Sequence, residues 1–363
     1  MADAGATFES YFTRQRRRQM RGSISRLEPV ASGTAGRGCI SCLKTTVGCD
    51  RTRQPIVPGD SRRRVRHHES WQVLLERITM KLGFYGSVGA GASARGAVAV
   101  AEAAEAGGFE SIWGPEHTVV PSGYQTTYPY AASGKMAGGA EEFDLPDPLI
   151  WLAYVAGRTT TLKLCTGILI LPQRNPVIAA KEIATLDSLS EGRVVLGIGV
   201  GWLAEEFAAL GVSFDDRSKR TDDAVEVMRK LWTGTRVSHD SQHARFTNCI
   251  SRPRPANGTI PIVIGGHTNA AARRAGRIGD GFFPFGTAAG IEPLLAAMRR
   301  SAEDAGRDPA GIEVTAICTE GDLDALTREA EGFATIGVHR VVVPVGPPDS
   351  VQHLGEELRS RLG

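Results

Sequence analysis

Two adjacent polar residues, Glu116 and His117, follow a short apolar run that ends in a tryptophan. A carboxylate beside an imidazole can act as proton donor, base or cofactor contact, because histidine titrates near neutral pH. The alternative is a polar pair in a surface loop, where such residues are also frequent. We expect both residues to be catalytic, with His117 as the proton partner.

A second cluster is rich in glycine. Gly199, Gly201 and Ala204 have the spacing of the dinucleotide-binding fingerprint, between an apolar run and a helical segment. That fingerprint needs an acidic residue at the end of the next strand, whereas Asp222 and Asp223 fall on a predicted helix. We therefore interpret the glycines as a loop that lets a cofactor approach the backbone. Trp202, the next residue, either covers that cofactor or packs as a buried aromatic residue.

Two further glycine-containing segments lie at the ends of predicted strands. In the segment Thr166, Gly167 and Ile168, the glycine permits close approach of a flat ring or relieves strand twist. The segment Gly265, Gly266, His267 and Thr268 opens a helix, and free amides at a helix N terminus can hold a phosphate. No Walker A sequence is present, which argues against nucleotide hydrolysis of the P-loop type.

The elements that position these residues alternate between strands and helices. Apolar runs predict strands at 82–85, 111–113, 162–171, 193–200, 260–264, 281–285, 312–317 and 340–345. Helices are predicted at 94–106, 148–158, 176–189, 217–232, 269–278, 292–305, 323–336 and 350–362, with a hairpin at 237–252 outside the barrel. This order predicts an α/β fold of the (β/α)8 TIM-barrel type; an open doubly wound sheet would leave the last units without a role. Its active site would lie at the C-terminal ends of the strands.

The segment 118–145 is long, rich in Gly, Ala, Tyr and Pro, and has no clear periodicity. Loops of this length are usually functional or disordered. Because it follows Glu116 and His117 directly, we expect it to cover the substrate.

The chain divides into a basic extension at 1–79 and a barrel at 80–363. The extension carries 15 Lys and Arg against seven Asp and Glu, and its Arg runs predict disorder. Cys39, Cys42 and Cys49 lack the second close pair of a zinc ribbon, so no metal site is expected. An organelle-targeting leader is opposed by its acidic residues, and we favour a start codon placed too early, with the protein beginning at Met80.

Composition excludes several classes of protein. The chain is 42% hydrophobic and 23% charged, with a net charge of +2, as in ordinary globular enzymes. No window approaches the roughly 18 consecutive apolar residues of a membrane helix, and no signal peptide is expected. The remainder after residue 79 is mildly acidic, without the clustered basic face of a nucleic-acid-binding protein. Cysteine is sparse for a chain of this length, and Cys165, Cys249 and Cys318 lie far apart, which favours the cytoplasm over an oxidising compartment.

Several motifs together resemble the luciferase-like monooxygenase superfamily. They lie at 164–172, 175–177, 180–182, 184–187, 190–193 and 197–202, and further similarity spans nearly all of 80–363. The resemblance is closest to the branch described as oxidoreductases dependent on the deazaflavin coenzyme F420.

The resemblance implies a barrel that holds the cofactor ring over the strand ends. Glu116 and His117 would face the ring or the substrate, and Thr166, Gly167 and Ile168 would match a strand-three bulge where relatives often carry a non-prolyl cis peptide. Gly199, Gly201 and Trp202 would line the cofactor tail, and Gly265, Gly266, His267 and Thr268 would hold its phosphate. Sugar-phosphate dehydrogenase relatives commonly have a Ser or Gly and an Asp at the positions of Pro115 and Glu116, so this chain departs from them there.

The function implied by the resemblance is hydride transfer between coenzyme F420 and a small organic substrate. One alternative is an FMN-dependent monooxygenase on the same fold, since both cofactors occupy similar loops. Another is a non-catalytic barrel that only carries cofactor, against which the Glu116–His117 pair and the long loop argue. The sequence leaves the oligomeric state open; a homodimer is one possibility, because relatives often pair through barrel helices.

Overall fold

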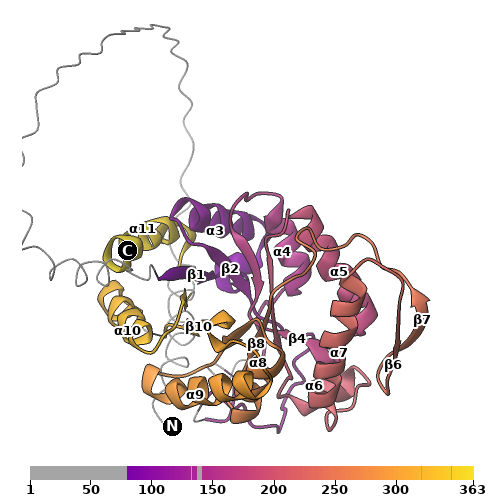
Figure 1. The fold of residues 1–363 in the computed structure, drawn as a ribbon. Helices are drawn as coiled ribbons and strands as arrows, with labels where there is room; N and C mark the ends of the chain where they lie inside the picture. Colours follow the sequence, from indigo (N-terminus) through magenta and orange to yellow (C-terminus); the bar gives the residue numbers. More distant parts are fainter. Residues whose placement is uncertain (1–79, 132, 137–140, 320, 345) are drawn as a thin grey trace, which may run out of the picture. The chain divides into compact units, whose positions relative to one another are not determined.

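Eight parallel strands form a closed barrel in the computed structural model, which describes residues 80–131, 133–136, 141–319, 321–344 and 346–363. The strands are β1 (Lys81–Tyr85), β2 (Ser111–Gly114), β3 (Lys163–Thr166), β5 (Val194–Gly199), β8 (Ile262–Gly265), β9 (Gly281–Phe283), β10 (Glu313–Ile317) and β11 (Arg340–Val343). Pairing between β3 and β5 closes the ring. The predicted barrel is therefore confirmed (Figure 1). The predictions made for 1–79 lie outside the described residues.

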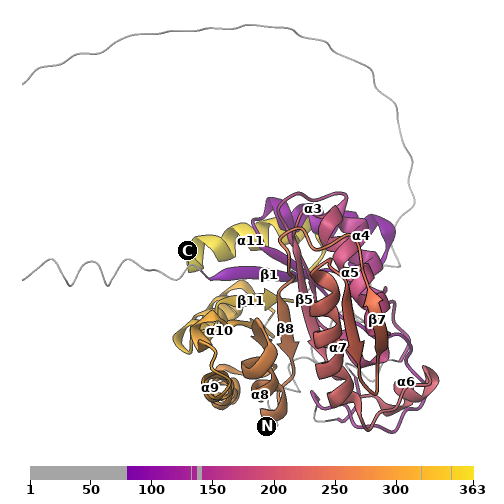
Figure 2. The same ribbon diagram turned by 45° about the vertical axis from the view of Figure 1, so that its right-hand side comes forward.

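Helices surround the strands (Figures 1 and 2). They are α3 (Ala94–Ala106), α4 (Pro148–Ala156), α5 (Pro176–Leu189), α6 (Ala204–Ala209), α7 (Arg217–Trp232), α8 (Asn269–Ile278), α9 (Ala288–Asp304), α10 (Leu323–Thr335) and α11 (Pro348–Leu362). Local signals set several starts: the Asn175 side chain accepts the amides of Val177 and Ile178, and Pro176 occupies the first turn of α5. No helix among the described residues has the length and apolar character needed to cross a bilayer.

The prediction of one continuous strand at 162–171 is wrong. The chain breaks after β3 at a cis bond between Gly167 and Ile168, resumes as β4 (Leu169–Ile170), and then forms the 3-10 turn η3 (Leu171–Gln173). Apart from Lys163 and Thr166 the run is apolar, because both of its parts are buried against β5 and the surrounding helices, so its composition conceals the break. Helix α9 also begins a turn earlier than predicted, because Thr287 caps it by accepting the Gly290 amide.

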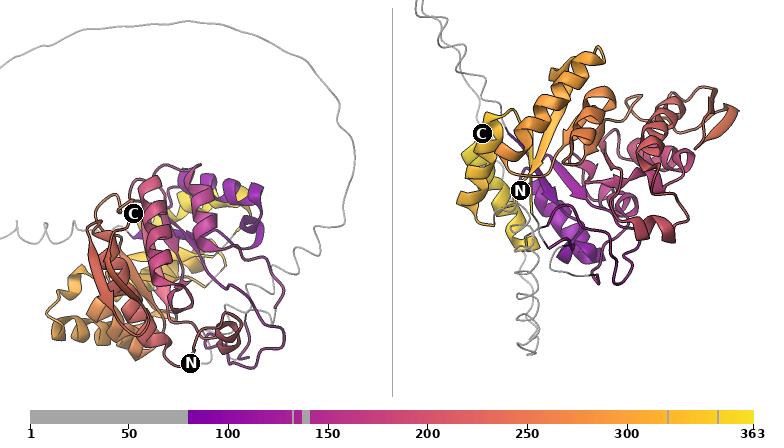
Figure 3. Two further views of the ribbon diagram at one scale, coloured as in Figure 1. Left: turned by 90° about the vertical axis from the view of Figure 1, so that its right-hand side faces the viewer. Right: turned by 90° about the horizontal axis from the view of Figure 1, so that it is seen from below.

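A hairpin lies outside the barrel, as predicted. Strands β6 (Val237–Asp240) and β7 (Arg245–Cys249) pair antiparallel and project at the edge of the molecule beyond α7, in red-orange in the right-hand view of Figure 3. The His239 Nε2 atom lies 2.9 Å from Asp223 Oδ1 on α7, so a buried imidazole attaches the hairpin to the body.

Alternating side chains fill the barrel in layers, as strand geometry requires. Near the N-terminal ends of the strands, Arg340 is only 2% exposed and is bonded to Glu110, Glu313 and Thr315. The interior above it is hydrophobic and consists of Trp113, Cys165, Val263, Phe283, Ile317 and Val342. The outer faces of the strands pack on the helices in a larger core.

Candidate functional site

A cavity of about 210 Å³ opens at the C-terminal ends of the strands. Its lining residues come from the ends of most barrel strands and from the long loop between β2 and α4. They are Tyr85, Val88, Pro115, Tyr128, Tyr130, Gly167, Ile168, Gly265, Gly266, Phe283, Pro284, Phe285, Ile317, Cys318, Thr319 and Pro344. The cavity therefore lies where a barrel of this type places its active site.

At one side of this cavity, the Ile168 side chain packs against two glycines, Gly199 and Gly265. A Cβ atom added at Gly199 would lie 2.5 Å from Ile168 Cδ1, and one added at Gly265 would lie 2.6 Å from Ile168 Cγ2. Both glycines are thus required to make room for Ile168, which lines the cavity. The Tyr85 hydroxyl donates to the Gly167 carbonyl at 2.5 Å and holds the adjacent backbone, where the cis bond implied by the resemblance is present.

The long loop contributes an aromatic wall. The Tyr130 ring centroid lies 4.6 Å from that of His267 and 5.1 Å from that of Phe285, and the Tyr128 ring contacts Trp202 at 5.0 Å. Burial raises the pKa of Tyr130 to about 12, and it raises the pKa values of Tyr85 and Tyr128 further above their usual range. These phenols therefore remain neutral hydrogen-bond donors at physiological pH.

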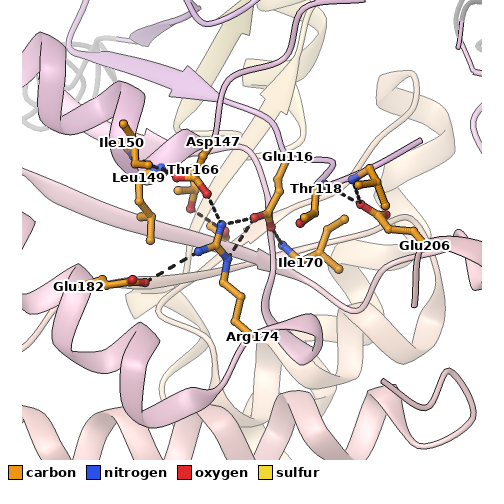
Figure 4. A network of polar contacts seen from close by, with 12 residues as sticks. Glu116, Thr118, Asp147, Leu149, Ile150, Thr166, Ile170, Arg174, Glu182 and Glu206 are labelled. Atoms are coloured by element: carbon orange, nitrogen blue, oxygen red, sulfur yellow. Dashed lines mark hydrogen bonds and ion pairs between the residues drawn. The ribbon is translucent and has the colours of Figure 1, made fainter. Parts of the chain in front are cut away.

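Glu116 belongs to an ion-pair network behind the cavity lining (Figure 4). Its carboxylate accepts the Ile170 amide and pairs with the Arg174 guanidinium, whose Nη2 atom also lies 2.5 Å from Asp147 Oδ2. Burial raises the pKa of Glu116, and Arg174 opposes that rise. The side chain fastens the segment after β4 to the end of β2, and it is not among the residues that line the cavity.

His117 is held by a carboxylate that the sequence did not single out. Its Nδ1 atom lies 3.0 Å from Oε2 of Glu206, which is fully buried and also accepts the Thr118 amide at 2.6 Å. Burial works to raise the pKa of Glu206, but the His117 contact and the Thr118 amide hold it below its usual value. The His117 ring meets the edge of Trp202 at 5.7 Å, and Trp202 in turn contacts Tyr128. His117 therefore lies two rings away from the cavity.

Glu206 belongs to α6, a six-residue helix that was not predicted because it is short and lacks a capping side chain. The adjacent Glu205 accepts the amides of Gln125 and Thr126, at 2.6 and 3.0 Å, and the Thr126 hydroxyl. These bonds, with that of the hydroxyl strongest, lower the pKa of Glu205 to about 2. Two neighbouring carboxylates thus fasten the long loop at both 118–119 and 125–126.

The structure brings four of the proposed cofactor-binding residues to the cavity: Gly167, Ile168, Gly265 and Gly266. The others lie around it. The Thr166 hydroxyl donates to the Gly197 carbonyl at 2.6 Å. Gly199, which has no side chain, leaves room for Ile168. Their roles toward a cofactor remain predictions.

Three more of the proposed cofactor-binding residues, Gly201, Thr268 and His267, lie in defined surroundings. Gly201 adopts a φ of 78°, and an added Cβ would lie 2.6 Å from Phe207. Thr268 caps α8 by accepting the Ala271 amide at 3.2 Å. The buried Nδ1 atom of His267 finds no hydrogen-bond partner among the described residues, and burial lowers the pKa of this imidazole.

The aromatic residues of the cavity lining and Cys318 were not predicted from the sequence to belong to the site. Tyr85 and Phe283 end strands, so the rule that directed attention to strand ends could have found them. Tyr128 and Tyr130 lie in an aperiodic loop, and nothing local indicates that they turn toward the barrel. Arg174 and Glu206 were also missed, because their partners lie 58 and 89 residues away.

One cluster of possible metal ligands exists among the described residues, at Asp223, Glu226 and His239. The Lys230 ammonium lies 2.7 Å from Glu226 and 3.1 Å from His239 Nδ1, and Asp223 bonds the other imidazole nitrogen. The cluster is therefore already paired internally and serves to attach the hairpin.

Comparison with known proteins identifies the family. The model described as luciferase-like monooxygenase matches residues 79–333. An uncharacterized protein of Mycobacterium bovis is 32% identical over 257 residues, which are 69% of this chain and 87% of that protein. An F420-dependent glucose-6-phosphate dehydrogenase of Segniliparus rotundus is 35% identical over 219 residues, 58% of this chain and 60% of that enzyme.

A solved structure shares the fold. It is the type II Baeyer-Villiger monooxygenase of Pseudomonas putida, the oxygenating constituent of 3,6-diketocamphane monooxygenase, in complex with FMN. It is 15% identical to this chain with a TM-score of 0.60, covering 78% of this chain and 98% of its own.

Proposed function

Because the chain belongs to the luciferase-like monooxygenase family, we propose that it is an F420-dependent oxidoreductase acting on a small organic substrate. The observation that carries this proposal is the cavity at the strand ends, with Ile168 on one side and neutral aromatic residues around it. Such a slot suits a flat, weakly polar ring. When bound, the deazaflavin supplies the hydride chemistry, and the protein supplies binding and orientation.

The chain's own residues would then have separate tasks. Ile168 would support the ring, and the phenols of Tyr128 and Tyr130 would offer neutral donors to ring or substrate oxygens. The Tyr85 hydroxyl donates to the Gly167 carbonyl and would hold the backbone behind the ring. We propose that Gly265, Gly266, His267 and Thr268 hold the phosphate, because the dipole of the ten-residue helix α8 favours an anion at its N terminus. Gly199, Gly201 and Trp202 would flank the cofactor tail.

We propose His117 as the proton partner. The buried Glu206 carboxylate orients its ring through the 3.0 Å contact at Nδ1. Because Trp202 and Tyr128 lie between this ring and the cavity, the proton would pass through solvent and not by direct contact with the substrate. Replacing His117 with Ala should lower turnover while sparing cofactor affinity. His353→Ala, on the exposed side of α11, is the matched control. Unchanged turnover in His117→Ala would overturn this assignment. For Glu116, whose carboxylate is bonded to Arg174 and Ile170, we propose that catalysis depends on its positioning of the segment after β4.

The cofactor is tested by titrating the full chain separately with coenzyme F420 and with FMN, following fluorescence. Tight binding of F420 alone supports the proposal. Tight binding of FMN alone favours the second candidate, an FMN-dependent monooxygenase, which the FMN-bound structural relative supports because both rings are flat and of similar size. Binding without turnover by any oxidant or reductant would favour a barrel that only carries cofactor.

Two further expectations accompany this function. We propose that the enzyme acts in the cytoplasm, consistent with its sparse cysteines. We also propose a homodimer, because the apolar Ile150 and Ile178 are 73% and 57% exposed on the adjacent helices α4 and α5. Light scattering of the purified chain measures its oligomeric state, and a monomeric mass at micromolar concentration would contradict the homodimer.

A further inference from the structure

We infer that the substrate of this site is an uncharged, largely apolar molecule with one or two carbonyl or hydroxyl oxygens, and not a sugar phosphate. This inference rests on the proposed function and specifies its substrate class. It matters because one relative of the chain is named as a glucose-6-phosphate dehydrogenase.

The described part of the cavity lining carries no charged side chain. Among the described residues that line the cavity, none is Lys, Arg, His, Asp or Glu. The positions of the barrel that the structure leaves undescribed are 132, 137–140, 320 and 345, and the sequence has Ala, Gly, Glu or Val at each of them. They add no cation either. A substrate phosphate in this lining would find no cation, and the amides at the start of α8 are already assigned to the phosphate of the cofactor. Its lost hydration would therefore not be replaced.

Basic side chains of the flanking elements already have partners within the protein. Arg174 pairs with Glu116 and Asp147. Arg217 donates to the Gly201 carbonyl at 3.3 Å and lies 3.7 Å from the centre of the Phe214 ring.

The other nearby bases are similarly engaged. Lys135, in the long loop, donates to the Tyr124 carbonyl. Arg220 donates to Pro172 at 3.4 Å and lies 3.3 Å from His243. To bind a phosphate, which prefers a bidentate guanidinium, one of these bases would have to abandon its present partners.

The groups that line the cavity fit a small, weakly polar molecule. Phe283, Phe285 and Ile317 supply apolar surface, and the polar groups are neutral phenols, the Cys318 thiol and the Thr319 hydroxyl. Ligand sites that are mostly apolar with a few convergent neutral donors select small, weakly polar molecules. In the oxidising direction, a bound deazaflavin would accept the hydrogen of a carbinol C–H bond together with its electron pair. The hydroxyl proton would leave to solvent, because no side chain of the described lining is a base. The product is the ketone or aldehyde.

The test uses the full chain saturated with the cofactor it binds. Cyclohexanol, cyclohexanone, benzyl alcohol and benzaldehyde are compared with glucose and glucose 6-phosphate, by calorimetry and by the change in cofactor absorbance. We expect the best neutral apolar probe to bind at least tenfold more tightly than glucose 6-phosphate. Equal or tighter binding of glucose 6-phosphate, or no binding by any apolar probe, would overturn the inference while leaving the cofactor assignment intact.

Two variants test whether the preference for apolar probes over glucose 6-phosphate arises from the cavity lining. Ile317→Arg places a guanidinium in the lining and should weaken apolar probes at least tenfold while improving glucose 6-phosphate. Thr319→Arg, at a half-buried position, repeats the test if the first variant does not fold. Ile250→Arg, at a 48% exposed position on the hairpin side, is the matched control. Wild-type affinity for the apolar probes in both cavity variants would overturn the inference. Failure of the wild-type chain to bind either F420 or FMN would instead refute the proposed function.

Discussion

The two ends of the barrel place their charged residues in opposite ways. At the N-terminal ends of the strands, the Arg340 guanidinium lies inside the barrel and pairs with Glu110 and Glu313. At the C-terminal ends, Glu116 and Arg174 pair behind the lining, and the lining itself is uncharged. One end is thus closed by an internal ion network, whereas the other keeps an apolar space for a ligand.

The difference shows how charge can support a site without entering it. Behind the cavity, Glu116 fastens the segment after β4, and Glu205 and Glu206 fasten the long loop. Each carboxylate accepts backbone amides, so it fixes the position of a segment rather than of a ligand. The cavity walls are held in place in this way while remaining neutral.

The largest effect is expected from Arg174→Met. This change leaves the Glu116 carboxylate, which is 6% exposed, without its cation and should cost about 4 kcal/mol at pH 8. Burial already raises the pKa of Glu116 above its usual 4.5, and the change should raise it further. The folded state then retains the proton that the unfolded state has lost, so stability falls as the pH rises from about 5 through that raised pKa.

Urea denaturation at pH 5.5 and pH 8 measures this effect. The gap between wild type and Arg174→Met should be wider at pH 8. Arg361→Met removes an exposed pair with Asp324 and should leave the free energy of unfolding essentially unchanged at either pH, because exposed ion pairs are screened by water. A gap that is independent of pH would mean that Glu116 is not the group left unpaired.

Arg340→Met tests the other end and should cost less, about 3 kcal/mol, by the same denaturation. Glu110 and Glu313 are each about one-third exposed, and Glu313 keeps Lys81 as a partner, so the remaining charges stay solvated. Cofactor affinity should not change, because the network lies at the opposite end from the cavity. A matching loss of cofactor affinity would break the proposed separation between the two ends.

Gly199→Ala should cost about 2 kcal/mol, because its Cβ would overlap Ile168. Displacement of Ile168 into the cavity should also weaken cofactor binding about tenfold, by about 1.4 kcal/mol. The matched control is Gly332→Ala in α10, where an added Cβ meets nothing within 4 Å and should be neutral or stabilising. Unchanged cofactor affinity in Gly199→Ala would remove Ile168 from the proposed site.

Glu205→Ala should have the smallest effect on global stability. Losing its bonds to Gln125 and Thr126 should favour local opening of the loop by about 1 kcal/mol, or about fivefold faster limited proteolysis at 118–145. Glu142→Ala, an exposed carboxylate of the same loop, is the control. Because the folded pKa of Glu205 is lowered to about 2, the anchor is complete above pH 4.5 and is lost as the pH falls toward 2. An opening rate equal to that of wild type would mean that Glu206 alone holds the loop.

Local signals explain why much of the fold was predictable. Helix α5 begins where Asn175 and Pro176 direct it to begin, and the bounds of α3, α7 and α8 agree with those predicted from periodicity. Capping and amphipathic spacing act over a few residues, so the sequence carries them directly. The interruption of the strand at Gly167 was not predicted, because an apolar run has the same composition whether its backbone forms one strand or two.

The candidate site was predictable only in part for the same reason. The rule that active sites lie at strand ends led to Gly167, Ile168, Gly265 and Gly266, all of which line the cavity. The glycine spacing at 199–201 was noticed, but its structural reason, the room needed by Ile168 and Phe207, comes from segments elsewhere in the chain.

The sequence by itself thus determined the alternation of strands and helices, the closed barrel and the end of the barrel that holds the site. Only the tertiary structure decided that Tyr128 and Tyr130 reach the cavity, that Glu116 turns to Arg174, and that Glu206 holds His117. Periodicity and capping are properties of neighbouring residues, whereas these contacts join distant parts of the chain, such as Tyr130 and Phe285, which are 155 positions apart. Their geometry exists only after the barrel has closed.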